Sequence, residues 1–97
     1  MKPEKMRSQC VEVASILKAV AHPERLMILC HLAEGERNVS EITALSGTSQ
    51  SQVSQFLNRM HREKLLRSRK EGKFSYYAIA DARLRKLLQA MQSIFCE

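Results

Sequence analysis

The sequence predicts a mainly α-helical domain that carries one small β-hairpin. Its 97 residues, of which 44% are hydrophobic, suffice for one compact domain, which we expect to span residues 1–97. Three glycines and two prolines are too few for an all-β fold rich in turns. Apolar residues recur at helical spacing until about residue 65, where the pattern becomes that of strands. We expect no enzyme, because an independent α/β enzyme needs more chain than this.

Helical spacing predicts two helices, over residues 8–20 and 23–34. The apolar stripe of the first helix is Val13, Ile16, Leu17 and Val20. Pro23 suits the first position of the second helix, and Gly35 lies where that helix is expected to end. Residues 26–32 are apolar nearly all round the second helix, which is typical of a helix in the middle of a domain.

Two capped helices follow, joined by a short turn. Asn38 and Glu41 form the pattern of a capping box, and the helix that they open is expected to end at Gly47. Residues 49–52 repeat the box pattern and open a helix with an apolar stripe: Val53, Phe56, Leu57 and Met60. Two capped helices joined by a turn of three or four residues with a glycine form a helix-turn-helix.

The second half of the chain predicts a hairpin and a last helix. Residues 66–70 and 74–79 are rich in strand-forming residues, and residues 71–73 form the turn between them. Asp81 is expected to cap a helix with an apolar side of six residues: Leu84, Leu87, Leu88, Met91, Ile94 and Phe95.

Basic residues cluster beside the helix-turn-helix. The chain holds 16 Lys and Arg against 10 acidic residues, and seven of the basic residues lie between positions 59 and 73. A charge run is often only a solvated face. Here it coincides with the motif that places a helix in the major groove, so the sequence predicts binding to double-stranded DNA.

The position of each polar residue suggests its role on DNA. The first turn of the second helix of the motif faces the base edges, and Gln pairs well with adenine. The candidate base contacts are Ser49, Gln50, Ser51, Gln52 and Gln55. Ser49 and Gln52 can also serve as helix caps. The candidate phosphate contacts, which set affinity and register, are Arg59, Arg62, Arg69, Lys70 and Lys73.

Four segments together resemble a known family. They are residues 16–19 (ILKA), 21–29 (AHPERLMIL), 49–57 (SQSQVSQFL) and 72–77 (GKFSYY). With them, almost the whole chain resembles the ArsR/SmtB family of bacterial winged-helix repressors. The resemblance implies a homodimer held by the first and last helices. It also implies a pseudo-palindromic operator that is released when a ligand or oxidant is sensed.

The metal sites of that family do not match this sequence. One uses a Cys-x-Cys on the first helix of the motif, where residues 38–44 contain no cysteine. Another uses Asp and His on the last helix, where Asp81 is present but no histidine follows His61. Soft and borderline metals need thiolate or imidazole ligands, so we expect neither metal site and no cofactor.

The cysteines suggest a different signal. A cysteine at the end of the second helix, here Cys30, together with the C-terminal Phe95-Cys96, resembles a thiol-responsive branch of the family. The resemblance implies that Cys30 and Cys96 sense persulfides or oxidants by forming a disulfide or polysulfide bridge. We assign Cys10 mostly to incidental packing, with sensing or crosslinking of subunits left open.

Three other interpretations stay open at this point. The signal could be a metal held by Cys30 and Cys96 with Cys10 or His31. The protein could raise transcription by displacing another DNA-bound protein, or its helix-turn-helix could serve protein contacts alone. The charged first ten residues have no apolar segment of a signal peptide, and the longest apolar run, residues 26–30, is short. We therefore expect a cytoplasmic protein without membrane contact.

Overall fold

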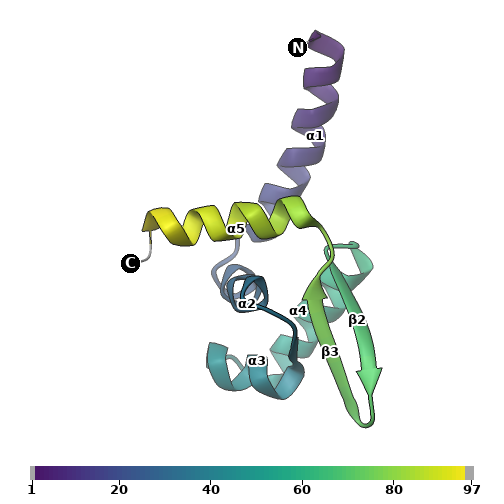
Figure 1. Cartoon of the computed structure of the whole chain (residues 1–97), viewed down its shortest axis with the longest axis vertical. Helices are drawn as coiled ribbons and strands as arrows, with labels where there is room; N and C mark the ends of the chain where they lie inside the picture. The colour runs from purple at the N-terminus through teal and green to yellow at the C-terminus, as the bar shows by residue number, and fades with distance from the viewer. Residues whose placement is uncertain (1, 96–97) are drawn as a thin grey trace.

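The computed structural model describes residues 2–95, which form five helices and a small antiparallel sheet at one side of the molecule (Figure 1). In chain order the elements are α1 (Pro3–Val20), α2 (Pro23–Ala33), β1 (Arg37–Asn38), α3 (Val39–Ser46), α4 (Gln50–Arg62), β2 (Leu66–Glu71), β3 (Phe74–Ile79) and α5 (Ala82–Phe95). The predicted mainly helical fold, the helix-turn-helix formed by α3 and α4 and the hairpin are confirmed.

The sheet has one strand more than the sequence predicted. Its order is β1-β3-β2, with Arg37 opposite Tyr77 and Asn38 opposite Tyr76. A strand of two residues has no periodicity, so no local pattern could reveal it. The hairpin turn is also tighter than predicted, because Glu71 belongs to β2. Gly72 adopts a φ of +61°, which glycine tolerates without steric cost.

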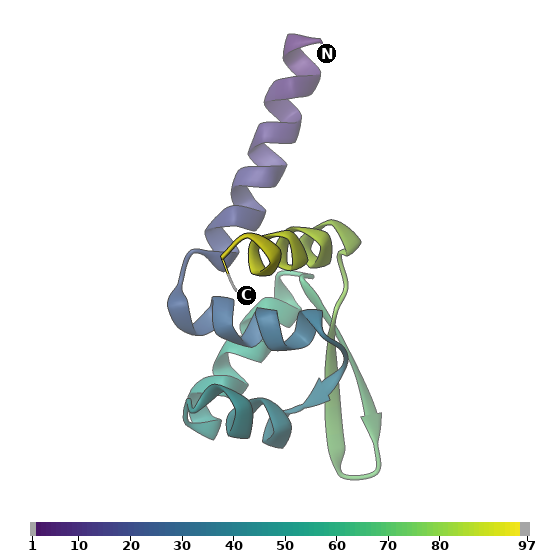
Figure 2. The same cartoon turned by 60° about the vertical axis from the view of Figure 1, so that its left-hand side comes forward.

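Helix α1 starts five residues earlier than predicted. Pro3 takes the first helical position and Glu4 lies in the first turn, where its charge suits the helix dipole. Met6 is the one residue that extends the apolar stripe into these first turns, so the spacing of apolar residues did not predict where the helix starts. Residues 3–15 are all exposed, and this part of α1 projects away from the rest of the chain (Figure 2).

Helix α2 lies at the centre of the core, as predicted. Ile28, Leu29 and Leu32 are fully buried, and α5 packs across α2. The nearly all-apolar surface of α2 predicts that Met27 is buried too, and this is wrong, because Met27 is 40% exposed. The elements that pack on α2 are α1, α3, α5 and β3, and none of them covers the side that carries Met27.

Hydrogen bonds at the helix ends position the two helices of the motif. The Glu41 N–H donates to Asn38 Oδ1 at 2.8 Å, and the Asn38 N–H donates to Glu41 Oε1 at 2.9 Å. Gly47 closes α3 with a φ of +72°. The Gln52 N–H then donates to Ser49 Oγ at 3.2 Å, which starts α4. The turn between the helices is therefore defined at both of its ends.

Replacement of Asn38 tests the capping box. Asn38→Ala removes the acceptor of the Glu41 N–H, and we expect the free energy of unfolding to fall by about 1 kcal/mol. Chemical denaturation at fixed protein concentration measures this change. Ser40→Ala, two residues away on the exposed side of α3, is the control and should change stability by much less. An equal loss in both variants would contradict the role of the box.

Candidate nucleic-acid interface

Helix α4 separates a buried face from a polar face. Val53, Leu57 and Met60 are fully buried and attach the helix to the core. The candidate base contacts are all exposed: Ser49, Gln50, Ser51, Gln52 and Gln55. The core thus holds α4 so that its polar first turn faces outward, as a reading helix requires.

A shallow groove of about 300 Å³ lies where α3, α4 and the hairpin meet. Gln50, a candidate base contact, and Lys73, a candidate phosphate contact, both line it. The other lining residues are Asn38, Val39, Ser40, Ser54, Phe74 and Ser75. The start of α3 and three hydroxyl groups thus share the groove with a lysine, which is a chemistry suited to phosphate oxygens. Sequence reasoning missed the serines, since only the fold brings them together.

The outer side of α4 carries a second hollow, of about 450 Å³. Gln55 and Arg62 line it together with Asn58 and His61, neither of which is among the candidate contacts. His61 Nε2 lies 3.2 Å from Ser68 Oγ, which connects the helix to β2. Helical spacing alone could have placed Asn58 beside Gln55 and Arg62.

The five candidate phosphate contacts differ in how the protein holds them. Within residues 2–95, Arg62, Lys70 and Lys73 form no ion pair. The Nε of Arg59 lies 3.3 Å from Glu63 Oε1. Arg69, the fifth candidate, is held most tightly.

Two carboxylates hold the side chain of Arg69. Its Nη2 lies 2.6 Å from Glu36 Oε1 and its Nη1 lies 2.8 Å from Glu71 Oε2. Its guanidinium also lies over the Tyr76 ring, 4.6 Å from the centroid. The hydrogen bond and charge of Arg69 lower the pKa of Glu36, and the two carboxylates raise the pKa of Arg69. This clamp ties β2 to the segment before β1.

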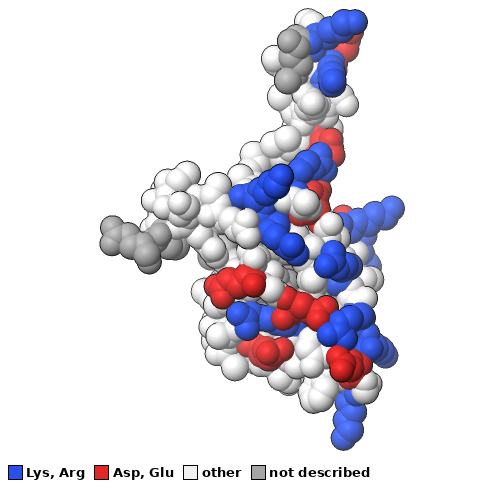
Figure 3. Space-filling view, in the orientation of Figure 1, with Lys and Arg blue, Asp and Glu red and all other residues white. Residues whose placement is uncertain are grey.

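Basic side chains follow the hairpin on the molecular surface. In Figure 3, Lys and Arg atoms gather over β2 and β3 and at the free end of the hairpin, with acidic groups between them. The hairpin therefore presents positive charge beside the groove and the first turn of α4. This arrangement can hold the phosphates of a duplex while α4 faces its bases.

The predicted thiol site is described only in part. Cys30 is half-buried on α2 and packs against the core. Its carbonyl oxygen accepts a hydrogen bond of 3.3 Å from Gln92 Nε2 on α5. Cys96 lies outside the described residues 2–95. Cys10, on α1, is exposed.

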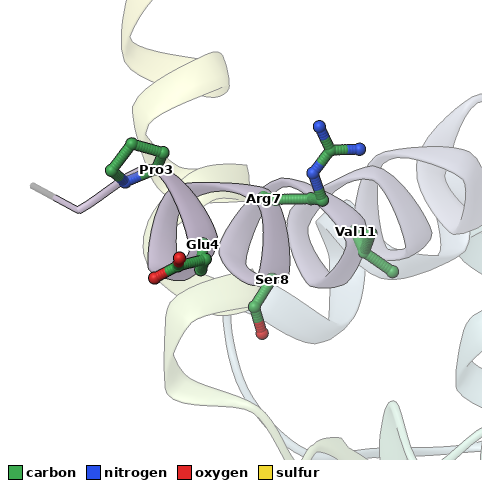
Figure 4. Close-up of a pocket in the computed structure, with 5 residues that line it drawn as sticks. All are labelled: Pro3, Glu4, Arg7, Ser8 and Val11. Carbon is green, nitrogen blue, oxygen red and sulfur yellow. The ribbon is translucent and has the colours of Figure 1, made fainter.

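Apolar side chains remain exposed on both terminal helices. Met6, Val13 and Leu17 form one stripe of α1, around an open hollow of about 400 Å³ that also includes Cys10. A neighbouring hollow of about 550 Å³ is lined by α1 residues alone, among them Glu4, Ser8 and Val11 (Figure 4). At the end of α5, Ile94 and Phe95 are 73% and 82% exposed.

Among residues 2–95, no three His, Cys, Asp or Glu side chains gather as metal ligands would. In the same part of the chain, no helix has both the length and the apolar character that a membrane crossing demands.

Comparison with known proteins identifies relatives of this chain. The family described as "Bacterial regulatory protein, arsR family" matches residues 22–68. The biofilm growth-associated repressor of Agrobacterium fabrum is 37% identical over 91 residues, which cover 94% of this chain and 78% of the relative.

Solved structures agree with this relationship. BigR, a transcriptional repressor from Xylella fastidiosa, is 35% identical with a TM-score of 0.89, covering 100% of this chain and 99% of that one. Reduced HlyU from Vibrio cholerae is 29% identical with a TM-score of 0.90, covering 97% and 99%. A homodimeric winged helix-turn-helix domain from Mycobacterium bovis is 31% identical with a TM-score of 0.77, covering 96% and 86%.

The relatives and the geometry lead to the same conclusion. The exposed first turn of α4, the groove beside it and the basic hairpin form the surface of a winged helix-turn-helix. The relatives share this fold over nearly the full chain. This chain therefore belongs to the ArsR family of bacterial regulatory proteins and is a DNA-binding transcriptional regulator.

Proposed function

We propose that this protein is a homodimeric repressor that binds a pseudo-palindromic operator and releases it when Cys30 and Cys96 become bridged. The observation that carries the DNA-binding half is the exposed polar turn of α4 beside a groove that Lys73 lines. The relatives described as repressors support the direction of regulation.

The first turn of α4 reads the bases in this proposal. Gln50, Gln52 and Gln55 are exposed, and a Gln side chain can donate to and accept from adenine at once. Ser49 and Ser51 supply hydroxyls that suit several bases. Because this turn contains no arginine, we expect a preference for A·T pairs over guanine at the positions it contacts.

The phosphate contacts divide by how freely each side chain can move. Lys73, Lys70 and Arg62 make no ion pair with the protein in residues 2–95, so they can reach a duplex at little cost. Arg59 and Arg69 reach a phosphate only by sharing or leaving their carboxylates. We therefore rank the first three as the stronger contacts.

Replacement of Lys73 tests this ranking through salt dependence. In a homodimer Lys73→Gln removes two contacts, so we expect the slope of log affinity against log salt to fall by about two. Affinity for all DNA sequences should fall alike. Fluorescence anisotropy over a salt series measures both, with Lys5→Gln at the projecting end of α1 as the charge-matched control. Equal salt slopes for Lys73→Gln and the control would show that Lys73 does not contact the DNA.

The exposed apolar faces support a homodimer. Met6, Val13 and Leu17 on α1, together with Ile94 and Phe95 on α5, would otherwise leave a large apolar area in water. A second copy of the chain can cover both faces in one symmetric interface. The homodimeric relative from Mycobacterium bovis supports this assembly. Two subunits then place two reading helices on the two halves of an operator.

The contact between α2 and α5 supports the thiol switch. Gln92 donates to the Cys30 carbonyl, and only four positions separate Gln92 from Cys96 in the chain. A disulfide needs Cα atoms within about 7 Å, and inserted sulfur atoms relax that demand. The similar structure described as reduced HlyU indicates that a redox state is a property of at least one relative.

The bridging reaction balances with a polysulfide as the oxidant. One thiolate attacks a sulfane sulfur and expels a shorter polysulfide, which leaves a cysteine persulfide. The second thiolate attacks the protein-bound sulfur of that persulfide and expels hydrosulfide. Two thiols are oxidised to a disulfide, one sulfane sulfur is reduced to hydrosulfide, and the thiol protons pass to the products.

A binding assay tests the proposed function as a whole. The reduced protein is titrated onto DNA from upstream of its own gene, before and after polysulfide treatment and again after dithiothreitol. We expect tight binding by the reduced protein, loss of binding after polysulfide and recovery of binding after dithiothreitol. Mass spectrometry of the polysulfide-treated protein should show one intramolecular bridge. No binding in the reduced state would refute operator recognition, and unchanged binding after bridging would refute the switch.

One relative favours a second outcome for the same DNA binding. The Vibrio cholerae relative is described as a transcriptional activator, which fits a protein that displaces another protein from DNA. A reporter gene under the operator distinguishes the two roles. Higher reporter output without the protein supports repression, and lower output supports displacement of a silencing protein.

A further inference from the structure

We propose that Glu24 and Thr48 form the link through which α2 sets the position of the reading helix. The proposal rests on the proposed function, because it describes how the thiol site at one end of α2 reaches DNA. Among the described residues, Thr48 is the one buried polar residue, and it immediately precedes Ser49, which caps α4. Its hydroxyl donates to a carboxylate oxygen of Glu24 in the first turn of α2.

The same turn of α2 also holds the other end of α4. Arg25, the residue after Glu24, places Nη2 2.9 Å from Glu63 Oε2, and Glu63 caps the C-terminal end of α4. Two consecutive residues of α2 thus contact both ends of the reading helix. The Arg25 side chain is mostly buried, whereas that of Glu63 is 38% exposed, so the pair is shielded from water only on the α2 side. A displacement of α2 therefore moves α4 as a whole.

The opposite end of α2 meets α5. The Cys30 carbonyl accepts from Gln92, and Ile28 and Leu29 between the two ends are fully buried. Six residues of α-helix separate Glu24 from Cys30, a distance of about 9 Å. A helix packed this tightly moves as a rigid unit, because core packing leaves no space for local bending. A change in how α5 packs against α2 therefore also displaces Glu24, and with it Thr48.

Of the two contacts, the hydrogen bond between Thr48 and Glu24, and not the ion pair between Arg25 and Glu63, is the one that transmits a displacement of α2 to the reading helix. Thr48 lies in the connection between α3 and α4, which sets the orientation of the start of α4. The candidate base contacts are in that part of the helix. Its N–H also donates to Ser46 Oγ at 3.2 Å, so the turn is tied to α3 as well. Thr48 is a positioning residue in this proposal, since it acts on DNA through the orientation of α4.

A double-mutant cycle in the reduced protein tests the link without any thiol chemistry. Thr48→Val keeps the side-chain shape but removes the donor, and Gln92→Ala loosens the contact of α5 with α2. We expect each single change to weaken operator binding by about fivefold, the effect of one lost hydrogen bond. Because both substitutions act on the position of α2, the operator affinity of the double variant should be no lower than that of the single variant with the lower affinity.

Independent sites would give a different result. Distant sites that do not communicate multiply their effects, which here would weaken binding by about 25-fold. Such multiplication, or a Gln92→Ala protein with unchanged affinity, overturns the inference. Thr48→Ser keeps the hydroxyl and should restore binding, whereas Thr43→Val removes a hydroxyl bonded only within α3 and should bind normally. If Thr48→Val does not fold, Glu24→Ala replaces it in the cycle.

A second arm connects the link to the thiol switch. In the wild-type protein, polysulfide should lower operator affinity, and Thr48→Val should reduce that change by at least half on a logarithmic scale. A Thr48→Val protein with the full response contradicts the link. A wild-type protein with no response refutes the proposed switch, while the cycle in the reduced protein still decides whether Thr48 transmits the position of α2.

Discussion

Cys96→Ser protein is expected to remain bound to its operator in the presence of polysulfide, under conditions in which the wild-type protein dissociates from it. Without the second sulfur no bridge can tie α5 to α2, so the reduced arrangement persists. Allosteric coupling in proteins commonly changes affinity by about 5- to 150-fold, and the wild-type response should fall in this range. Anisotropy with labelled operator DNA, before and after treatment, measures both proteins.

The choice of variant matters for the interpretation. Cys30 packs against the core, so its replacement also disturbs packing, whereas Cys96 follows the last residue of α5. Cys96→Ser should therefore bind DNA normally when reduced. Cys10→Ser is the matched control, since Cys10 is an exposed cysteine on α1, and it should respond as the wild type does. Release of DNA by Cys96→Ser protein after treatment would exclude the pair as the sensor.

A charge on the apolar stripe of α1 is expected to abolish the dimer. Leu17 is exposed in the single chain, so Leu17→Glu leaves the fold intact. In a dimer the same carboxylate would be buried without a partner, which is very costly. We expect a monomer at micromolar concentration and operator affinity lower by at least about 100-fold, because the two half-sites are no longer bound together.

The size of the particle and its DNA affinity are measured separately. Light scattering with size-exclusion chromatography gives the mass, and anisotropy gives the affinity. Ser8→Glu adds the same charge on another side of α1, among the residues that Figure 4 shows, and should remain a dimer. A dimeric Leu17→Glu protein would place the interface elsewhere.

The elements themselves were predictable because their signals are local. Asn38 with Glu41 and Ser49 with Gln52 act over four residues, and the hairpin depends on Gly72 between two short runs of strand-forming residues. The exposure of Gln50 and Gln55 also followed from helical spacing. The start of α1 and strand β1 were missed because each has too few apolar residues to show a period of its own.

The functional surface was predictable as a set of residues but not as an arrangement. Sequence reasoning grouped Arg69 with Lys70 and Lys73 by charge. The structure separates them, because Glu36, 33 residues away, holds Arg69. Likewise, the serines of the groove come from three elements, and no spacing along the chain connects Ser40, Ser54 and Ser75.

Sequence by itself determined the helices, their caps, the hairpin and the family to which the chain belongs, since each depends on neighbours a few positions apart. Only the tertiary structure decided which cations are free, which residues share the groove and how α2 holds both ends of α4. Glu24 and Thr48 illustrate the reason: their bond spans 24 positions and exists only because the core packs α2 against the motif.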